Sequence, residues 1–578
     1  MSRIYGFVNF GANKKIEVGS LEPQNQLFSD NDIAAAAIGE LFEPKSSFLA
    51  KTISDLYRQY GEDCVHKLEG QFNFCIWDKR NNKLIIATDR FGTSALHYYR
   101  NENCLIFASR IKDILKNNIF IPTINKTALY NYFSFTFIPT PDTIYNEINK
   151  LPPGYMLVIE NGNVSLKKYW DIFYLKEGKR SEKYYVEKIR QGLEEAVRKR
   201  FDLQSEPGTI GAFLSGGLDS STVSGIMKKI SGQQIKTFSI GFEEAGYSEL
   251  EYVDIAAKHF GLESHQYIVR PKDLLEAIKV LIKEYDEPFG NSSGIAAYYC
   301  MKLAKENGVN IMLGGDGGDE NFAGYERYVT NKIYSYYQNF PRILRKGLIE
   351  PCLLNLPFRK IKNYINHSNI PNPERFFMYE LYPMRNRGEI FSDEFLGQID
   401  QLATLKVLKD YYYAPETRAE LNRLTYLDAK IGLIDNDLRN KIDKISRLVE
   451  VKARYPMLDT RLWELGAKIP ENLKLKGHTK KYIYKKAFLD FLPKEIILKK
   501  KHGFGVPFAL WLKNDKEIRS FTYERLLDSK AQKRGIFQKG FPEKILRLHD
   551  EEKTSYYGDI IWVFLMLEIW HNEWADNR

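Results

Sequence analysis

The sequence contains 578 residues, and at roughly 100–200 residues per domain this length predicts at least two domains. Hydrophobic residues make up 44% and charged residues 27%, which are ordinary values for a globular protein and argue against wholesale disorder. The formal net charge is +10, from 84 basic and 74 acidic residues. This mild excess suits a small anionic ligand without requiring nucleic acid, and we interpret the basic run Lys499–Lys501 as a solvated face.

The cysteines and the apolar stretches of the sequence indicate the cellular compartment of the protein. The N-terminal residues lack the apolar core of a signal peptide, and the most apolar stretch, Ile560–Leu567, is too short to span a bilayer. We read that stretch as a buried core helix and expect a cytoplasmic protein without a membrane partner. The cysteines contain no C-x-x-C pair, so neither a disulfide framework nor a zinc site is predicted. They are Cys64, Cys75, Cys104, Cys300 and Cys352.

The first part of the chain, to about residue 170, is predicted to be rich in strands. Phe72–Asp78 is aromatic and partly alternating, and a polar turn separates it from a second apolar run, Lys83–Thr88. Leu105–Ala108 is a further short strand, and Glu160–Asn163 carries a strong hairpin signal. Residues 127–155, which contain proline and threonine, are interpreted as a connector.

The pattern changes near residue 180, where helical periodicity begins. Tyr184–Phe201 is a charged, amphipathic helix, and beyond it buried strands alternate with helices. This alternation predicts a doubly wound parallel sheet, with ligands at the carboxyl ends of the strands. After about residue 330 the chain is mainly helical, so we divide it into domains 1–170 and 180–578. The three expected strands are Ile210–Leu214, Lys236–Gly241 and Val309–Leu313.

A glycine-rich loop, Ser215–Ser221 (SGGLDSS), lies between the first of these strands and a helix. Glycines let backbone amides approach an anion, the helix start presents unpaired N–H groups, and the serines add donors. Asp219 would repel a phosphate by itself, so its carboxylate makes sense mainly as a Mg²⁺ ligand. The loop lacks the G-K-[ST] ending of a Walker A motif. Taken alone, it is also compatible with a simple turn capped by an aspartate.

A second loop, Gly314–Glu320 (GGDGGDE), follows the third strand. Four glycines and three acids directly after a buried strand are difficult to explain by packing, although an acidic surface turn is the alternative. We expect Asp319 to share a metal ion with Asp219 across the strand ends, and Asp316 to polarise or deprotonate a substrate amine.

These motifs resemble class B, glutamine-dependent asparagine synthetases. The resemblance rests on Ser215–Ser221, Phe238–Phe242, Asp286–Phe289 and Gly314–Glu320. It continues downstream and is collinear over nearly the whole chain, through Arg454–Asp459, Gly477–Tyr482, Lys501–Pro507 and Trp562–Trp570.

The resemblance implies an α/β chain of two parts. The first is an N-terminal Ntn-hydrolase-like (glutaminase-like), β-rich α+β domain. The second is a doubly wound parallel-sheet ATP-pyrophosphatase domain, similar to adenine nucleotide α-hydrolases, with a helical C-terminal part. ATP and Mg²⁺ are the implied ligands. The implied nucleotide-binding residues are Leu214, Ser215, Gly216, Gly217, Asp219, Ser220, Ile240, Gly314 and Gly315.

The same resemblance assigns the remaining site residues and the chemistry. Asp219 and Asp319 are the implied Mg²⁺ ligands, and Asp316 stands where the family places an acid near the reacting carboxylate. Lys481 matches the lysine that stabilises charge when the acyl-adenylate is attacked. The expected reaction is attack of a substrate carboxylate on the α-phosphorus of ATP with loss of pyrophosphate, followed by attack of an amine to give an amide and AMP.

The N-terminal domain departs from the family at its catalytic residues. Family members that hydrolyse glutamine carry a cysteine exposed by removal of Met1, whereas this chain has Ser2 and no cysteine before Cys64. The N-G-E segment corresponds to Ile38–Glu40, so its asparagine is absent, and the D-T-E segment falls near Leu49–Lys51, so its carboxylate is absent. We therefore expect a retained fold without glutaminase chemistry.

Two further departures concern the acceptor. Lys452 replaces a family glutamate and Arg447 a family methionine, and we expect both to lie in the helical half that shapes the acceptor site, which leaves open a substrate other than aspartate. An asparagine-type ligase using ammonia and a tailoring ligase of the β-lactam-synthetase or lasso-peptide-cyclase kind both stay open, as does a non-catalytic homologue. Expected partners are a small-molecule or peptide carboxylate with an amine or ammonia, and no nucleic acid. A homodimer or a protein supplying ammonia or peptide is also left open.

Overall fold

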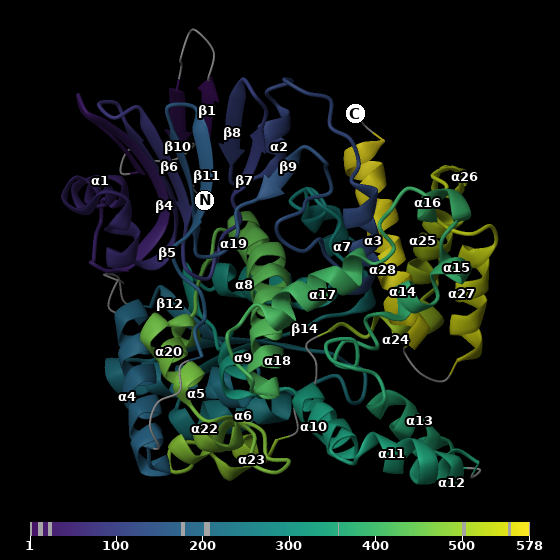
Figure 1. The fold of residues 1–578 in the computed structure, drawn as a ribbon. Helices are drawn as coiled ribbons and strands as arrows, with labels where there is room; N and C mark the ends of the chain where they lie inside the picture. Colours follow the sequence, from purple (N-terminus) through teal and green to yellow (C-terminus); the bar gives the residue numbers. More distant parts are fainter. Residues whose placement is uncertain are drawn as a thin grey trace.

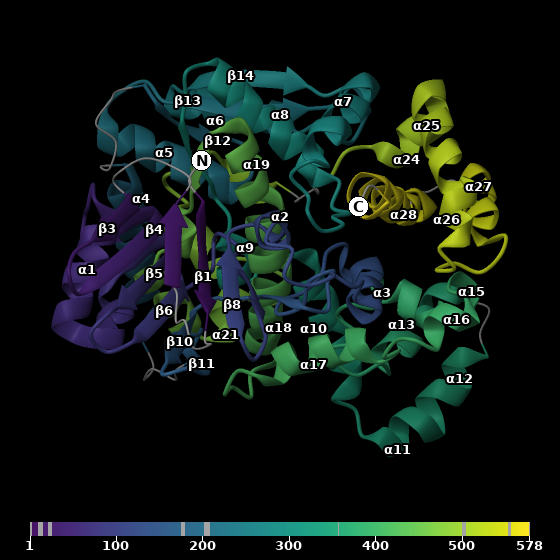
Figure 2. The same cartoon turned by 90° about the horizontal axis from the view of Figure 1, so that it is seen from above.

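The computed structural model describes residues 3–9, 16–20, 26–174, 180–201, 208–355, 358–499, 505–552 and 556–576. Ser2 and residues 501–504 lie outside these ranges, so the expectations placed on them stay predictions. Figures 1 and 2 show a β-rich N-terminal part beside an α/β part, with helices of the last third covering the remaining side.

The N-terminal part contains two antiparallel sheets. One has the strand order β2-β1-β8-β7-β9 and the other β11-β10-β6-β5-β4-β3. The expected hairpin at Glu160–Asn163 is present between β10 and β11, with Asn161 and Gly162 both at positive φ. The strands are β1 (Ile4–Asn9), β2 (Ile16–Ser20), β3 (Leu27–Ser29), β4 (Ile33–Glu43), β5 (Glu69–Asp78), β6 (Lys83–Thr88), β7 (His97–Arg100), β8 (Cys104–Ala108), β9 (Ile148–Lys150), β10 (Tyr155–Glu160) and β11 (Asn163–Lys168).

Alternation along these strands places apolar residues on two packed faces. One buried cluster joins the two sheets and includes Val8, Ile86 and Phe107. A second cluster packs the other face of the six-stranded sheet against α1 (Leu49–Tyr60), through residues such as Ile53 and Phe74. The sequence patterns at Phe72–Asp78 and Lys83–Thr88 therefore predicted this sheet correctly.

The expected connector is not wholly irregular. Residues 126–135 form helix α3 (Lys126–Phe135), whose N-terminus is capped by the Asn125 side chain accepting a hydrogen bond from the Ala128 amide at 2.9 Å. Eight of its residues are buried, and its helical period was hidden because apolar side chains occur all around it. A short helix, α2 (Ile111–Leu115), precedes it.

The second part is built on a five-stranded sheet in the order β14-β13-β12-β15-β16, and every neighbouring pair is parallel. The doubly wound α/β fold expected from the sequence is thus confirmed. The short edge strand β16 and the half-buried β14 were not expected, because neither is a continuous apolar run. The strands are β12 (Ile210–Phe213), β13 (Lys236–Gly241), β14 (Glu263–Ile268), β15 (Ile311–Leu313) and β16 (Lys452–Arg454).

Helices surround this sheet and position the loops that follow its strands. The helices of this α/β part are α4 (Glu182–Phe201), α5 (Leu218–Ser231), α6 (Leu250–Phe260), α7 (Pro271–Leu281), α8 (Ser293–Glu306), α9 (Gly318–Phe322) and α10 (Glu326–Gln338). Later segments return to it as η4 (Ala429–Ile442), α19 (Asp443–Val449), α20 (Thr460–Lys468), α22 (Tyr482–Ala487) and α23 (Lys494–Leu498).

The last third is helical, as expected. Its apolar stretch Ile560–Leu567 lies within α28 (Tyr556–Trp570) and is almost wholly buried, which agrees with a core helix. Within the described residues, no helix is long and apolar enough to cross a membrane. The peripheral helical segments include α11 (Arg342–Leu344), η3 (Arg345–Ile349), α12 (Glu350–Leu354), α13 (Arg359–Ser368), α17 (Ala403–Tyr413), α18 (Glu420–Asp428), α24 (Phe508–Asn514), α25 (Lys516–Leu526) and α27 (Phe541–Glu551).

Candidate active site

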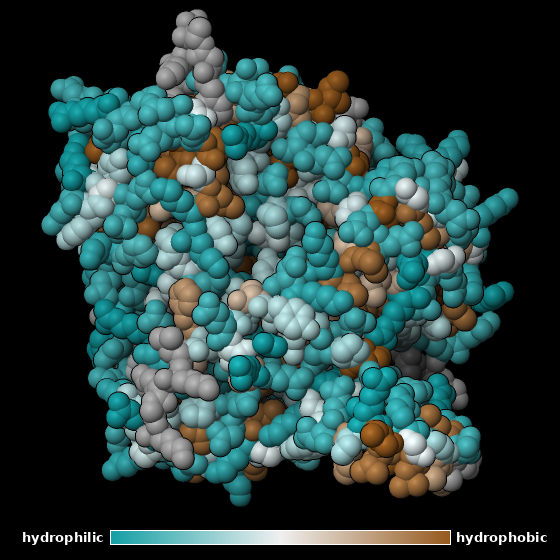
Figure 3. Space-filling model, viewed as in Figure 1, coloured by the Kyte–Doolittle hydropathy of each residue, from teal (hydrophilic) through white to brown (hydrophobic). Residues whose placement is uncertain are grey.

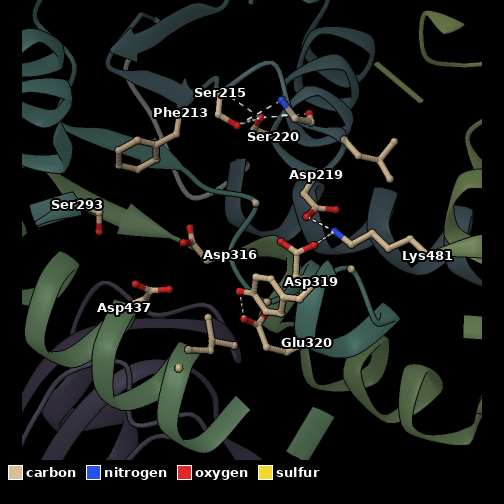
Figure 4. Close-up of a pocket in the computed structure, with 18 of the residues that line it drawn as sticks. Phe213, Ser215, Asp219, Ser220, Ser293, Asp316, Asp319, Glu320, Asp437 and Lys481 are labelled. Carbon is tan, nitrogen blue, oxygen red and sulfur yellow. Dashed lines mark hydrogen bonds and ion pairs between the residues drawn. The ribbon is translucent and has the colours of Figure 1, made fainter. Parts of the chain in front are cut away.

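A cavity of about 610 Å³ opens where the expected glycine loops leave the parallel sheet (Figure 4). Ser215 and Asp219 line it from the loop after β12, and Asp316 and Asp319 line it from the loop after β15. Because β12 and β15 are parallel neighbours, the ends of both strands lie on the same edge of the sheet. Lys481, which is more than 160 residues away in sequence, completes the wall.

Hydrogen bonds of its own serines fix the conformation of the first loop. Ser220 Oγ accepts a hydrogen bond from the Ser215 amide at 3.2 Å and lies 3.0 Å from Ser215 Oγ. The Gly217 amide donates to Ser215 Oγ at 3.3 Å, and α5 begins at the next residue. Gly216 has a φ of 63°, a conformation that favours glycine, and it packs against Tyr252. The loop therefore presents hydroxyls and a helix start to the cavity.

The two loops are in direct contact. A Cβ atom at Gly318 would lie only 2.7 Å from Asp219 Cγ, so the second loop approaches the first more closely than any larger residue allows. This explains why glycines surround the acids in the Gly314–Glu320 segment.

Lys481 joins the two acidic loops. Its Nζ lies 2.7 Å from Asp319 Oδ1 and also contacts Asp219 Oδ2. Burial lowers the pKa of Lys481, but the charges of Asp219 and Asp319 outweigh burial and raise that pKa above its ordinary value. The ammonium is therefore charged, and the two carboxylates converge on this single cation.

Asp316 faces the cavity from the same loop without joining this cluster (Figure 4). Burial raises the pKa of Asp316 to about 6, Lys441 opposes that rise, and Asp437 adds to it. A carboxylate with this pKa is mostly ionised near neutral pH and is basic enough to accept a proton from an amine or to orient one.

The predicted nucleotide-binding residues divide into two groups. Ser215, Gly217, Asp219, Ser220 and Gly315 line the cavity. The others lie behind the lining: Leu214, Gly216, Ile240 and Gly314. Their visible role is to hold the loops, since the Leu214 carbonyl accepts a bond from Ser239 Oγ at 2.5 Å and the Gly314 amide donates to the Arg454 carbonyl at 2.9 Å.

The interpretation of the basic run Lys499–Lys501 as a solvated face is wrong for Lys499. Its side chain is buried, donates to the Ser215 carbonyl at 3.1 Å and pairs with Glu249 at 3.0 Å. It therefore buttresses the first glycine loop from within the cavity wall. A lysine in a charged run gives no sequence signal for burial, and Lys500 and Lys501 lie outside the described residues.

Lys485 is a second cation that sequence reasoning missed. Six cations line the cavity, and five have a carboxylate partner within the described residues: Arg327, Lys441, Lys480, Lys481 and Lys499. Lys485 has none within those same residues, and burial together with Lys480 and Lys481 lowers its pKa. One turn of α22 after Lys481, it faces a site with room for an anionic group.

The segment η4 forms the wall opposite the glycine loops. Asp437 and Lys441 line the cavity and pair with one another, and Lys441 Nζ donates to Ser293 Oγ at 3.2 Å. These charged residues were not predicted, because their segment has no motif and follows β15 by more than 100 residues.

The expectation for Arg447 and Lys452 is wrong. Both line a separate, smaller cavity of about 120 Å³ and are absent from the lining of the large one. That smaller cavity lies between the two domains, because Glu40 and Gln71 of the N-terminal sheets also line it. Helix α19, which carries Arg447, points this residue toward the N-terminal domain, so the substitution does not shape the acceptor side of the candidate active site.

Glu40 is engaged by the second domain. Its carboxylate accepts two hydrogen bonds from Arg454, at 2.7 and 2.9 Å, and a third from Lys452 at 3.0 Å. Burial by itself raises the pKa of Glu40, yet Arg454 and Lys452 outweigh it and hold that pKa at about 2. The one acid retained from the N-G-E segment is thus used as an interdomain contact.

The D-E-P-F segment also joins the domains. Asp286 Oδ1 lies 2.9 Å from Lys444 Nζ, and Asp286 Oδ2 accepts from the Ile111 amide at 2.8 Å. Glu287 pairs with Lys150 at 2.9 Å. These acids are buried, so the segment has a clear packing role at the base of the N-terminal part.

The parallel sheet, its paired glycine loops and the buried lysine define an α/β synthetase-type domain, here joined to an amidotransferase-like domain. Comparison with known families agrees with this description. The asparagine synthase family profile matches residues 188–572, and the glutamine amidotransferase domain profile matches residues 39–170. The chain therefore belongs to the asparagine synthase family.

Curated relatives carry related names. The chain is 29% identical over 534 residues to asparagine synthetase [glutamine-hydrolyzing] 1 of Bacillus subtilis, covering 90% of this chain and 80% of the relative. It is 33% identical over 393 residues to putative asparagine synthetase [glutamine-hydrolyzing] 2 of Methanocaldococcus jannaschii, covering 62% and 73%. It is also similar to amidase chyE of Penicillium rubens, at 24% identity, covering 84% and 79%. Family membership makes the chain an enzyme of the ligase type.

Proposed function

We propose that this enzyme uses ATP to adenylate a substrate carboxylate and then joins the acyl group to an amine or to ammonia, releasing AMP. The observation that carries the proposal is the convergence of Asp219 and Asp319 on the Lys481 ammonium, beside a glycine loop at the start of α5. This arrangement supports the proposal, because hydroxyls, backbone N–H groups and a positive charge gather in one cavity and together suit a polyphosphate leaving group.

The residues present fit Mg²⁺ as a ligand of the nucleotide. Within the described residues no group of three or more potential protein ligands gathers, so a cation bound only by protein side chains is not supported there. Mg²⁺ commonly takes one or two carboxylates together with substrate phosphates, and Asp219 and Asp319 supply that number. When bound, the ion would offset negative charge on the pyrophosphate.

The chain's own residues support the two chemical steps. Ser215, Ser220 and the Gly217 amide bind and orient the phosphates, and Lys481 stabilises charge as the acyl-adenylate forms and is attacked. Asp316 orients the attacking amine and accepts its proton, a role that agrees with its raised pKa. Lys485 and Lys499 add positive charge along the same wall.

We further propose that the N-terminal domain does not hydrolyse glutamine. Three carboxylate–cation contacts fix Glu40 to Arg454 and Lys452, so this acid is not available to hold a substrate amine. The described cysteines of the first domain are poor nucleophiles, because burial raises the pKa of Cys64 to about 12 and that of Cys75 still further, and it also raises the pKa of Cys104. The domain then serves the synthetase part through its contacts.

ATP–pyrophosphate exchange across a panel of carboxylates, with and without ammonia, tests the proposal. We expect exchange with at least one acid and its loss in Asp219→Ala. Exchange with aspartate and ammonia-dependent asparagine formation would identify an asparagine-type ligase. If the folded wild-type protein showed no exchange with any acid of the panel, adenylation would be contradicted.

A tailoring ligase, whose amine belongs to a larger substrate, is the second candidate. It is favoured by the charged wall on η4, because Asp437 and Lys441 line the cavity opposite the glycine loops, where they can contact a charged second substrate. Glutamine and ammonia as nitrogen donors give a separate test of the first domain. Equal product with Ser2→Ala and wild type is expected, whereas loss of a glutamine-dependent product in Ser2→Ala would overturn the proposed inactivity.

A further inference from the structure

An apolar ridge projects from the helical periphery, far from the candidate active site. We use the term 340–358 ridge for five exposed side chains: Phe340, Ile343, Leu344, Leu348 and Phe358. Figure 3 shows hydrophobic surface at the lower right, where Figure 1 places α11 and α12. Large exposed apolar side chains that gather in one short segment indicate an interaction surface, since isolated ones are normal on any protein.

Three of the five ridge side chains, those of Ile343, Leu344 and Leu348, stand on a continuous helical run from Arg342 to Leu354. Phe340 precedes this run, and Phe358 follows it directly before α13. The inner face of the run is fixed by Glu350, which is buried and accepts hydrogen bonds from Asn369 at 3.0 Å and Tyr337 at 3.3 Å. Leu344 and Leu348 are four residues apart and so share a face. The outer face therefore keeps its apolar side chains in solvent while the rest of the run is held in place.

Positive charge flanks this apolar face. Residues 339–362 of the sequence contain six basic residues and one acid, Glu350. Lys346 pairs with that acid at 3.0 Å. Within the part of the chain that the structure describes, none of the other five cations has a carboxylate partner: Arg342, Arg345, Arg359, Lys360 and Lys362. Unpaired cations beside exposed apolar groups call for a partner that is both anionic and apolar.

We infer that the 340–358 ridge docks this enzyme on an anionic lipid surface. A convex row of bulky apolar side chains between cations matches the requirements of an interfacial helix, which inserts its apolar face below the headgroups and pairs its cations with them. A second copy of the same face is disfavoured, because it would bring like charges together. Helices α11 and α12 lie at the edge of the molecule (Figure 2), which is where a flat surface can approach the chain.

Docking also gives the candidate active site a defined position. Helix α10 follows Tyr325 and carries Arg327 in its first turn, both of which line the cavity, and it ends two residues before Phe340. Its 13 residues correspond to about 20 Å at 1.5 Å per residue, so the cavity would lie at that order of distance from the surface. This inference departs from the sequence-based expectation of no membrane partner, because a ridge of this kind has no transmembrane signal.

Vesicle cosedimentation of the full chain tests the inference, with phosphatidylglycerol-containing vesicles compared with pure phosphatidylcholine vesicles. Binding is expected to the anionic vesicles and to weaken in high salt. The double variant Ile343→Asp, Leu348→Asp should lose binding. Ile121→Asp is the matched control, because Ile121 is 86% exposed and Ile343 85% exposed, and it should bind as the wild type does.

Arg359→Gln with Lys360→Gln separates charge from apolar insertion. At about 1 kcal/mol per cation near an anionic surface, removing two should weaken binding about 30-fold. No sedimentation of the wild type with anionic vesicles at low salt, or equal binding by the ridge and control variants, would overturn the inference. Binding of an acidic protein or self-association through the ridge without vesicle binding would do the same. ATP–pyrophosphate exchange is measured separately in these variants, so a failure of the proposed function can be distinguished from a failure of membrane docking.

Discussion

Lys481 Nζ lies 2.7 Å from Asp319 Oδ1 while it also contacts Asp219, so a single ammonium holds together two loops that follow different strands. Lys481 itself has a φ of 51°, a left-handed conformation that is uncommon outside glycine, and it directly precedes α22. Strained backbone at a charged, buried side chain favours a functional role over a packing role.

Lys481→Ala should reduce amide formation by about 100- to 1,000-fold, the size of effect seen when one stabilising donor is removed from an active site. The variant leaves Asp219 and Asp319 close together without their shared cation, so binding of the nucleotide should change as well. AMP release measures the first effect. Lys486→Ala is the control, because Lys486 pairs with Glu182, is absent from the cavity lining and should retain activity within a few-fold. Equal losses in both variants would contradict a specific role for Lys481.

Gly324→Ala should damage the same cluster by steric overlap. A Cβ at Gly324 would overlap both Asp319 Oδ1 and Lys481 Cε, so the ion pair must move. We expect a loss of about 1–3 kcal/mol in stability from overpacking, together with lower exchange activity. Gly388→Ala is a matched control, since nothing lies within 4 Å of a Cβ built there. If thermal unfolding and exchange activity were both unchanged in Gly324→Ala, the ion pair between Asp319 and Lys481 would be shown to tolerate displacement.

Lys485→Ala should weaken binding of ATP and of pyrophosphate about 10-fold or more, because a charge-assisted hydrogen bond contributes about 1.5–3 kcal/mol. Among the described lining cations it is the one without a carboxylate partner, so an anionic ligand is its expected counter-charge. Inhibition by pyrophosphate and the KM for ATP measure the change. Lys486→Ala provides a neighbouring control, since Lys486 contacts Glu182 away from the cavity. The idea fails if both variants show the wild-type KM.

The raised pKa of Asp316 predicts a pH dependence of amide formation. Burial raises its pKa to about 6, so the carboxyl is protonated below that pH and cannot accept the amine proton. Single-turnover amide formation from the acyl-adenylate should therefore fall as pH decreases through about 6. In Asp316→Asn the rate should be low and this limb of the profile should disappear. A wild-type limb that persists in Asp316→Asn would assign the dependence to another group.

Local patterns predicted much of the fold and part of the site. The loops at Ser215–Ser221 and Gly314–Glu320 were identified because glycines and acids directly follow buried strands, where sheet topology leaves few arrangements. Lys499 was misread because a lysine run is usually solvated, and its burial depends on a loop 284 residues earlier. Arg447 and Lys452 were placed on the wrong side of their segment, because side-chain direction at a domain junction depends on a partner domain that no local pattern specifies.

Glu40→Ala should destabilise the contact between the domains. Breaking a buried, bidentate ion pair costs about 3 kcal/mol or more, because Arg454 is left buried without its acid. A lower Tm is expected, while Glu187→Ala, which removes an exposed pair with Lys183, should change stability by less than about 0.5 kcal/mol.

The Glu40 contribution should also depend on pH in a defined direction. Burial raises the pKa of Glu40, but Arg454 and Lys452 outweigh it and lower that pKa to about 2, below the ordinary value of 4.5. A depressed pKa stabilises the folded state above the unfolded pKa, so the wild-type advantage over Glu40→Ala should be complete above about pH 4.5. It should shrink as pH falls from there toward 2. Thermal unfolding of both proteins at pH 7, 4 and 3 measures the difference, and a constant gap across this range would show that the ion pair does not contribute as proposed.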